Sequence, residues 1–443
     1  MPVSTSTKSP RVAVLADSDT RWKWGALTAN RTVPDSRLSG FLLRGRATPT
    51  ARQLREVGVR ADDLREVTAV EFLREMERDR AEYDVVVLAL VGGAVQAMLH
   101  GLARTWKGHT KRPVVVTGYV GVVYEKLADG LLLRHGADLV LANSRHDAER
   151  FRAVYEGVGA DASSVVETAL PFLGGKPYEK KGQDDKDDPY TVVFAAQPSV
   201  PDTAADRTYL LRRLAEHARL HPDREVLLKL RSKPGEHTTH IEELPYQKLA
   251  QRLPGGLPAN CRLVYGHMGE VLDRTDLLVT VSSTAALEAL HRRIPTVILT
   301  DLGVREALGN HHFTGSGCLA SWDQLDSGHQ PVTDEKWVAR QGVAADGAYE
   351  TAFDAARERI ATLLESAELP PLQPYYTPVT APGYLPRILA RHHLGPDGAP
   401  LPGAPVSDKE PGRVRRIVRR VARGAYRHGV QRVAPVIRRM GEL

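Results

Sequence analysis

The sequence contains little of what marks secreted, thiolate-rich or membrane-spanning proteins. Its only two cysteines, Cys261 and Cys318, lack a CxxC or Cys/His spacing, which excludes a disulfide framework and a thiolate zinc site. No apolar run reaches the roughly 18 residues of a membrane span, and residues 1–10 lack the apolar core of a secretory signal. We therefore expect a cytoplasmic protein.

Two common nucleotide-binding motifs are also missing. No GxGxxG follows the first predicted strand of either half of the chain, and GxxxxGK[ST] does not occur. Dehydrogenases and P-loop NTPases are therefore disfavoured.

Length and charge indicate several soluble domains and a distinct basic end. At about 150 residues per domain, 443 residues predict roughly two or three units. The contents of 42% hydrophobic and 26% charged residues are typical of globular proteins. The formal net charge is +6, but residues 411–443 carry ten arginines and one glutamate, or +9, so residues 1–410 carry −3.

Short β-branched runs alternate with helical patterns in both halves, which predicts parallel strands joined by crossover helices. We therefore expect an α/β protein with two Rossmann-like, doubly wound domains. The predicted strands are residues 11–16, 40–43, 84–90, 113–117, 138–142 and 165–169, then 191–195, 225–230, 262–265, 277–281 and 296–299.

Changes in composition suggest the domain boundaries. Residues 174–189, GGKPYEKKGQDDKDDP, have almost no apolar content and are typical of a linker. The expected organisation is a disordered N-terminus (1–10), an N-terminal domain (11–173), the linker, a C-terminal domain (190–372), a return segment packing on the N-terminal domain (373–395), a flexible tether (396–412) and a basic tail (413–443).

Ligands of doubly wound sheets bind outside the carboxyl ends of the strands, so the loops there are the candidate sites. The first loop, DSDTRWKWG, offers the carboxylates Asp17 and Asp19, the cations Arg21 and Lys23, and the indole Trp24. This mixture suits a polar substrate. The alternative is a surface loop in which Asp19 or Thr20 caps the next helix.

A second loop, TGYVGVVYE, follows the strand at 113–117. Gly118 and Gly121, on either side of Tyr119, would allow the backbone to approach a ligand closely. Glu125, or Asp129 one helical turn later, could take a proton from an attacking hydroxyl. A twisted loop with a capping glutamate is the alternative.

The sharpest signal lies in the second half, where Ser282, Ser283 and Thr284 precede the helical pattern AALEALHRR. Hydroxyls and free amides at a helix N-terminus favour a phosphate or diphosphate, and Glu288 could bind ribose hydroxyls. Plain N-capping, which needs only one hydroxyl, is the alternative.

Basic side chains would complete this phosphate site. Lys229, Arg231 and Lys233 alternate out of a strand and can share one side of it. The segment HTTH lacks a third ligand at a recognised spacing, so we expect no metal site. Further candidates in neighbouring loops are Gln197, His237, His311, Gly315 and Ser316.

Two Rossmann-like halves, a linker and the SST helix together resemble glycosyltransferases of the GT-B fold over about residues 10–395. KLRSKPGE followed by VTVSSTAALEAL resembles the paired motifs of bacterial sialyltransferases and polysialyltransferases, and is similar to glycerophosphotransferases of teichoic acid synthesis. Lys233-Pro234 replaces the His-Pro pair of the sialyltransferase pattern, and only Asp129-Gly130 resembles its acidic motif. Uncharacterised actinobacterial glycosyltransferase-like families of cell-surface polymer synthesis are more similar.

The resemblance implies a metal-independent, inverting glycosyltransferase that needs no cofactor. Its C-terminal domain would hold a nucleotide-activated sugar, with a CMP-linked ulosonate as one candidate, and its N-terminal domain a cell-surface glycan or lipid-linked acceptor. Asp17, Asp19, Glu125 or Asp129 would supply the base. A polyol-phosphate transferase, a UDP-sugar 2-epimerase-like enzyme and a catalytically silent nucleotide- or nucleic-acid-binding scaffold are the alternatives.

The basic tail has its own pattern. Val414, Ile417, Val418 and Val421 recur at helical spacing with arginines opposite them, which predicts an amphipathic basic helix. Such a helix would lie on anionic lipid through Arg413 to Arg439, with each surface cation contributing about 1 kcal/mol. We expect peripheral association with the inner face of the membrane. A nucleic-acid-binding or solvated tail is the less favoured alternative.

Overall fold

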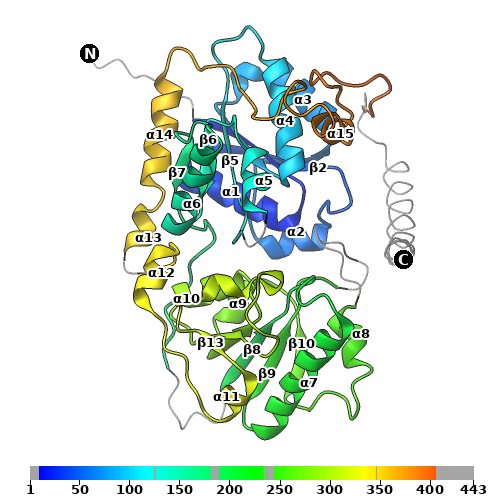
Figure 1. Ribbon diagram of the computed structural model, residues 1–443, viewed down its shortest axis with the longest axis vertical. Helices are drawn as coiled ribbons and strands as arrows, with labels where there is room; N and C mark the ends of the chain where they lie inside the picture. The colour runs from blue at the N-terminus through cyan, green and yellow to red at the C-terminus, as the bar shows by residue number, and fades with distance from the viewer. Residues whose placement is uncertain are drawn as a thin grey trace. The chain divides into compact units, whose positions relative to one another are not determined.

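The computed structural model describes residues 9–123, 126–180, 189–233, 236, 244–345 and 347–405, and the chain forms two units (Figure 1). Unit 1 consists of residues 9–172 and 340–405, and unit 2 of residues 173–339. Each unit is built around one parallel β-sheet covered by helices. The expected architecture of two doubly wound α/β domains is therefore confirmed.

The sheet of unit 1 has the strand order β3-β2-β1-β4-β5-β6-β7, and every pairing is parallel. Its central strands are nearly continuous apolar runs because helices cover both faces. The strands are β1 (Arg11–Ala16), β2 (Arg37–Leu43), β3 (Asp63–Val67), β4 (Val85–Ala89), β5 (Val114–Gly118), β6 (Leu139–Ala142) and β7 (Val165–Glu167).

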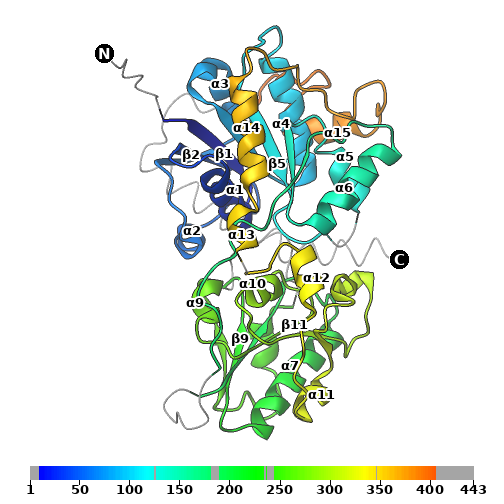
Figure 2. The same ribbon diagram turned by 90° about the vertical axis from the view of Figure 1, so that its left-hand side faces the viewer.

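Alternate residues of β1 point into two different cores of unit 1. Val12 and Val14 pack with α1 and α14, whereas Ala13 and Leu15 pack with α3, α4 and α15. Helix α14 lies next to α1 and contacts it (Figure 2). The helices of unit 1 are α1 (Asp19–Thr32), α2 (Ala51–Val57), α3 (Ala69–Arg78), α4 (Gly92–Thr105), α5 (Leu127–Leu132), α6 (Arg145–Gly157), α13 (Ala348–Thr351), α14 (Asp354–Glu365) and α15 (Leu385–Ala390), with a 3-10 turn, η1, at Arg80–Glu82.

The sheet of unit 2 has the strand order β10-β9-β8-β11-β12-β13 and is also parallel. Phe194 of β8 packs on Tyr246 and Trp322, in the core formed with α7. Its elements are β8 (Thr191–Ala195), α7 (Ala204–Leu220), β9 (Glu225–Lys229), α8 (Tyr246–Ala250), β10 (Cys261–Val264), α9 (Met268–Leu272), β11 (Leu277–Thr280), α10 (Ala285–His291), β12 (Thr296–Leu299), the 3-10 turns η2 (Glu306–Leu308) and η3 (Asn310–Phe313), β13 (Leu319–Ala320) and α11 (Trp322–Asp326); α12 (Glu335–Arg340) leads out of the unit.

Two strands of the structure are absent from the sequence-based prediction. β3 is a polar edge strand, and its residues Asp63, Leu64 and Arg65 are exposed. It therefore lacks the apolar run by which the other strands were predicted. β13 is two residues long and pairs only with the end of β12. The strands predicted at 11–16, 191–195 and 296–299 have the predicted bounds.

The chain returns to unit 1 at residue 340, whereas the boundary was expected between 372 and 373. Helix α14 is the cause, because Ala356 and Ile360 are buried in a core of unit 1. Arg357 Nε also donates to the carbonyl of Arg31, in α1, at 2.8 Å.

Parts of the expected linker and tether are bound to the units. Arg292 Nε, at the end of α10, donates to the Gly174 carbonyl at 2.7 Å. In the expected tether, Pro405 accepts a hydrogen bond of 3.1 Å from the Thr68 hydroxyl. These contacts use backbone carbonyls, which composition does not reveal.

The basic tail at 413–443 and residues 1–8 lie outside the described residues. Within the described ranges, no helix has the length and apolar character needed to cross a bilayer.

Candidate functional site

Each sheet has one topological switch point, the place where the strand order reverses. In unit 1 it lies between β1 and β4, and in unit 2 between β8 and β11. Chain connections leave these neighbouring strands in opposite directions, which opens a crevice at their carboxyl ends where ligands of this architecture bind. Both switch points are bridged by a side-chain hydrogen bond between two residues far apart in the sequence.

In unit 1 the bridging side chain is Asp17, directly after β1. Its carboxylate accepts a hydrogen bond of 2.9 Å from the backbone N–H of Val91, which precedes α4, and one of 3.0 Å from Arg21 Nη1. The Asp17 side chain is 15% exposed. Burial lowers the pKa of His392, from the return segment, and the negative charge of Asp17 opposes that shift.

Arg134, which no sequence pattern singled out, holds the same edge of the sheet together. Its guanidinium donates to the carbonyls of Leu90, Gly118 and Gly130 and lies 4.0 Å from the centre of the Tyr119 ring. Arg134 is 5% exposed, and among the described residues no carboxylate forms an ion pair with it. Burial lowers its pKa. A lone charged residue within the apolar run GLLLRHG was the available signal.

The expected aromatic and glycine contacts to substrate are replaced by packing. Trp24 is fully buried, and its Nε1 donates to Asn143 Oδ1 at 3.3 Å, so it cannot stack on a substrate. A Cβ on Gly118 would lie 2.8 Å from the Leu141 carbonyl oxygen and from the Trp24 ring. Gly118 therefore allows Trp24 to pack against β5.

The other candidates of unit 1 are spread along its elements. Asp19 lies in the first turn of α1, whose cap is Ser18, and not Asp19. Lys23 Nζ lies 4.7 Å from the centre of the Phe172 ring. Asp129 is exposed on α5, Gly121 is half-buried in the loop after β5, and Glu125 lies outside the described residues.

In unit 2 the switch point is bridged by Gln197, after β8, and Ser282, after β11. The Ser282 N–H donates to Gln197 Oε1 at 3.0 Å, and the Ser282 hydroxyl donates to the Leu308 carbonyl at 2.6 Å. Ser282 is 1% exposed. The structure thus brings together two predicted residues, but the Ser282 hydroxyl is buried and bonds to a backbone carbonyl of the protein itself.

Ser283 and Thr284 are the accessible hydroxyls of the SST segment. Both are half-buried. The Ser283 hydroxyl accepts a hydrogen bond of 3.2 Å from the Ala285 N–H, while Thr284, at the start of α10, makes no capping bond through its side chain. Glu288 follows on α10 and is half-buried with a partner of its own.

The predicted basic residues differ in exposure. Lys229, at the end of β9, is buried, and its Nζ donates to the Leu230 carbonyl at 2.9 Å. Arg231 is half-buried, and Lys233 is exposed with its ammonium 5.6 Å from the centre of the Tyr265 ring. His237 lies outside the described residues.

In the predicted 309–317 segment, Ser316 is buried and its hydroxyl accepts from the Cys318 N–H at 3.1 Å, so it is a structural residue. His311 is half-buried, and Gly315 is exposed with a φ of 81°.

Arg207 is the second arginine that no sequence pattern singled out. It lies on the buried face of α7, and its Nη1 donates to the carbonyls of Gln197, Pro198 and Pro201 at 3.2 to 3.3 Å. The guanidinium lies 4.3 Å from the centre of the Tyr246 ring. Arg207 thereby fixes the loop that carries Gln197, as Arg134 fixes the loops around Asp17.

Comparison with protein families gives one match. Residues 12–363, most of the chain, match the model of the family described as "Putative glycosyltransferase (DUF6716)". No curated protein matches the sequence.

Comparison with solved structures shows the fold. The S. aureus MnaA–UDP structure is 12% identical with a TM-score of 0.51, and the match covers 82% of this chain and 99% of that one. The UDP-GlcNAc 2-epimerase of Neisseria meningitidis bound to UDP-GlcNAc is 10% identical with a TM-score of 0.48, covering 80% and 100%. MurG of Acinetobacter baumannii is 13% identical with a TM-score of 0.39, covering 81% and 100%. The fold is GT-B-like.

Proposed function

The chain belongs to the glycosyltransferase family DUF6716, and we propose that it transfers a sugar from a nucleotide-activated donor held at the switch point of unit 2. The observation that carries this proposal is the Gln197–Ser282 link, which fixes two loops side by side at the carboxyl ends of β8 and β11. Ligands of doubly wound sheets occupy this position.

The chemistry of this edge suits a phosphate group. Thr284 offers a half-buried hydroxyl at the start of α10. Lys229 is the last residue of β9, the strand that pairs with β8, and Arg231 follows two residues later. A nucleotide leaving group gains negative charge as its bond to the sugar breaks. Preorganised hydroxyls and cations stabilise that charge without a metal ion.

The acceptor side of the proposal rests on Asp17. The acceptor hydroxyl attacks the anomeric carbon, the bond from that carbon to the phosphate oxygen breaks, and the hydroxyl proton passes to the Asp17 carboxylate. One such displacement inverts the anomeric configuration. Arg21 and the Val91 N–H orient the carboxylate, and its side chain is partly exposed.

Ligand-induced thermal shifts of the full-length protein test the donor site. UDP is the first nucleotide to try, since the S. aureus MnaA structure of the same fold holds it, followed by CMP, CDP, GDP and ADP. A nucleotide at 100 times its Kd stabilises the folded state by about 2.7 kcal/mol. We expect one nucleotide to raise the melting temperature and Thr284→Ala to reduce that rise.

Ser327→Ala is the matched control, because Ser327 is an exposed serine at the end of α11 in the same unit. It should leave the nucleotide shift unchanged. If no nucleotide stabilises the wild-type protein, or if Thr284→Ala responds like wild type, the donor site does not lie at this switch point.

Asp17→Asn tests the acceptor side separately. The amide keeps the shape and an acceptor oxygen but cannot take a proton, so we expect kcat to fall by about 10²- to 10⁴-fold. The nucleotide thermal shift should persist, because Asp17 belongs to unit 1. Full activity in Asp17→Asn would exclude this residue as the base.

We further propose that the basic tail brings the enzyme to an anionic membrane surface and so to a lipid-linked acceptor. The support is the sequence alone, with ten arginines and one glutamate in residues 411–443. Each arginine close to an anionic lipid surface contributes about 1 kcal/mol to membrane binding.

A further inference from the structure

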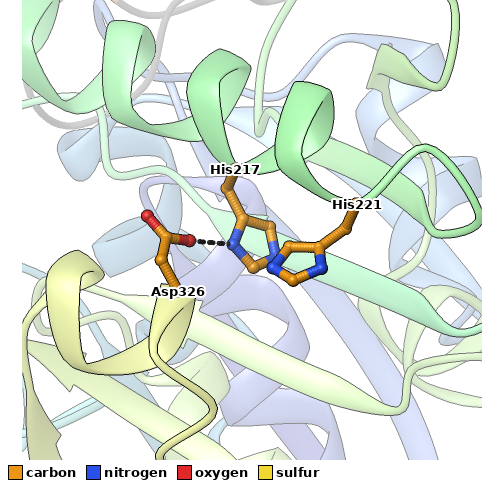
Figure 3. Close-up of side chains that lie close together, drawn as sticks. All are labelled: His217, His221 and Asp326. Carbon is orange, nitrogen blue, oxygen red and sulfur yellow. Dashed lines mark hydrogen bonds and ion pairs between the residues drawn. The ribbon is translucent and has the colours of Figure 1, made fainter.

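Three side chains of ligand-forming types converge in unit 2, away from the switch point (Figure 3). His217 lies in the last turn of α7, His221 ends that helix, and Asp326 ends α11. One ligand atom from each residue lies within 4.8 Å of those of the other two. The helix supplies the histidines four residues apart, on one face.

The contacts of these residues differ in a way that points to a missing partner. His217 is fully buried, and its Nδ1 lies 2.6 Å from Asp326 Oδ1. The other oxygen of Asp326 accepts a hydrogen bond of 3.0 Å from Arg213. His221 Nε2, in contrast, is shielded from solvent and has no hydrogen-bond partner among the residues that the structure describes.

We propose that His217, His221 and Asp326 bind a divalent transition-metal ion, with Zn²⁺ as the best match. Imidazole nitrogens and a carboxylate oxygen are ligands that Zn²⁺ prefers, and two histidines at i and i+4 on a helix are a recurrent pair. A water molecule would take the fourth tetrahedral position. This site goes beyond the proposed transfer reaction, because it would fasten α11 to α7.

Binding requires a small rearrangement and the movement of a proton within the His217 ring. Zn²⁺ bonds of about 2.0–2.1 Å place neighbouring tetrahedral ligands about 3.3 Å apart, so His217 Nδ1 and Asp326 Oδ1 must move apart from 2.6 Å. The proton on His217 Nδ1 then moves to Nε2 of the same ring, so that the neutral imidazole presents its Nδ1 lone pair to the metal.

Two arginines face the site, and nearby acids offset the charge of one of them. Arg213 pairs with Asp323 at 2.7 Å and with Glu216 at 3.3 Å besides Asp326. Arg224 Nη1 lies 3.4 Å from His217 Nε2, and its guanidinium lies 5.0 Å from the centre of the Tyr190 ring. Asp223 acts electrostatically on His221 from the loop after α7. With the metal on Nδ1, His217 Nε2 carries the ring proton, so the Arg224 N–H that lies 3.4 Å from it must turn away.

Zinc titration of the full-length protein tests the proposal. The protein is stripped with a chelator and dialysed, and Zn²⁺ is then added in competition with a chromogenic indicator. We expect one equivalent to bind, and Co²⁺ in its place to give the visible absorption bands of a tetrahedral ion. His221→Ala and Asp326→Asn should each weaken binding at least tenfold and remove the Co²⁺ bands, with an unchanged circular dichroism spectrum.

The His237→Ala/His240→Ala double variant is the matched control, because HTTH is another pair of histidines one helical turn apart in sequence. It should keep the full equivalent. If wild type binds no zinc in competition with the indicator, or if only the HTTH variant loses the metal, the proposal is overturned. The His221→Gln variant, which keeps a polar side chain, should lose the metal as His221→Ala does, and retention of the metal in this variant would also contradict the site.

Discussion

The Gln197–Ser282 link offers a direct test of the switch point in unit 2. Gln197→Ala removes the acceptor of the Ser282 N–H, a bond of 3.0 Å at a residue that is 1% exposed. A buried N–H that loses its partner costs about 1–3 kcal/mol. We therefore expect the free energy of unfolding to fall by about 2 kcal/mol.

A double-mutant cycle with Ser282→Ala separates the two parts of the link. Ser282→Ala keeps the backbone N–H, so of the link to Gln197 only the hydroxyl contacts of 3.2 and 3.3 Å are lost. The bond of the hydroxyl to the Leu308 carbonyl is lost as well, but it is common to both backgrounds and cancels in the cycle. We expect a coupling energy of about 0.5–1.5 kcal/mol for the hydroxyl contacts with Gln197. Gln197→Ala should then still cost about 1 kcal/mol in the Ser282→Ala background.

Urea unfolding of the full-length protein, followed by tryptophan fluorescence, measures these values, since the buried Trp322 reports on unit 2. Gln251→Ala is the control because Gln251 is exposed at the end of α8, and it should change stability by no more than about 0.5 kcal/mol. The affinity for the stabilising nucleotide should also fall at least tenfold in Gln197→Ala. Wild-type stability of Gln197→Ala in both backgrounds would refute the reasoning.

Three further predictions concern packing, pH and the tail. Gly118→Ala should lower the free energy of unfolding by about 1–3 kcal/mol, because the new Cβ would lie 2.8 Å from the Leu141 carbonyl oxygen. Gly45→Ala is the control: a Cβ there would have no atom within 4 Å, so this variant should be close to neutral in the same urea experiment. Burial raises the pKa of Asp147 from 3.8 to about 6, so the native state binds the proton more tightly and stability should fall as pH rises between these values. Asp147→Asn should remove on the order of 3 kcal/mol of that loss, seen by comparing urea midpoints at about pH 4 and about pH 8 with those of wild type. Removal of residues 413–443 should reduce sedimentation with phosphatidylglycerol vesicles at least tenfold, and unchanged sedimentation would assign membrane binding elsewhere.

The elements that the sequence predicted best are strands in which buried apolar residues directly follow one another. Strands β1, β8 and β12 are apolar runs because helices cover both faces of each sheet. The N-terminal cap of α6 is equally local, since the Ser144 hydroxyl accepts from the Asp147 N–H three residues later. Candidate loops could be named because the carboxyl ends of parallel strands meet at one edge.

Tertiary structure alone decided which candidates meet and which are buried. Polar residues flank Trp24 in the sequence, as they would flank a residue that stacks on a substrate. Its hydrogen-bond partner Asn143, which shows that it is buried instead, lies 119 positions away. Arg134 holds the carbonyls of Gly118 and Leu90, 16 and 44 positions away, and Arg207 that of Gln197, 10 positions away; such a bond requires no particular residue type in the partner. His217, His221 and Asp326 had no sequence signal as a group because the carboxylate comes from another helix.

The sequence by itself thus determined the periodicity of the chain: which segments become strands and helices, that two parallel sheets form, and which loops lie at their functional edges. These properties depend on neighbours within a few residues. The return of the chain at residue 340, the burial of Trp24 and the Gln197–Ser282 link depend on contacts between residues far apart in the sequence. Side-chain packing in the folded units decides such contacts, and local patterns do not encode them.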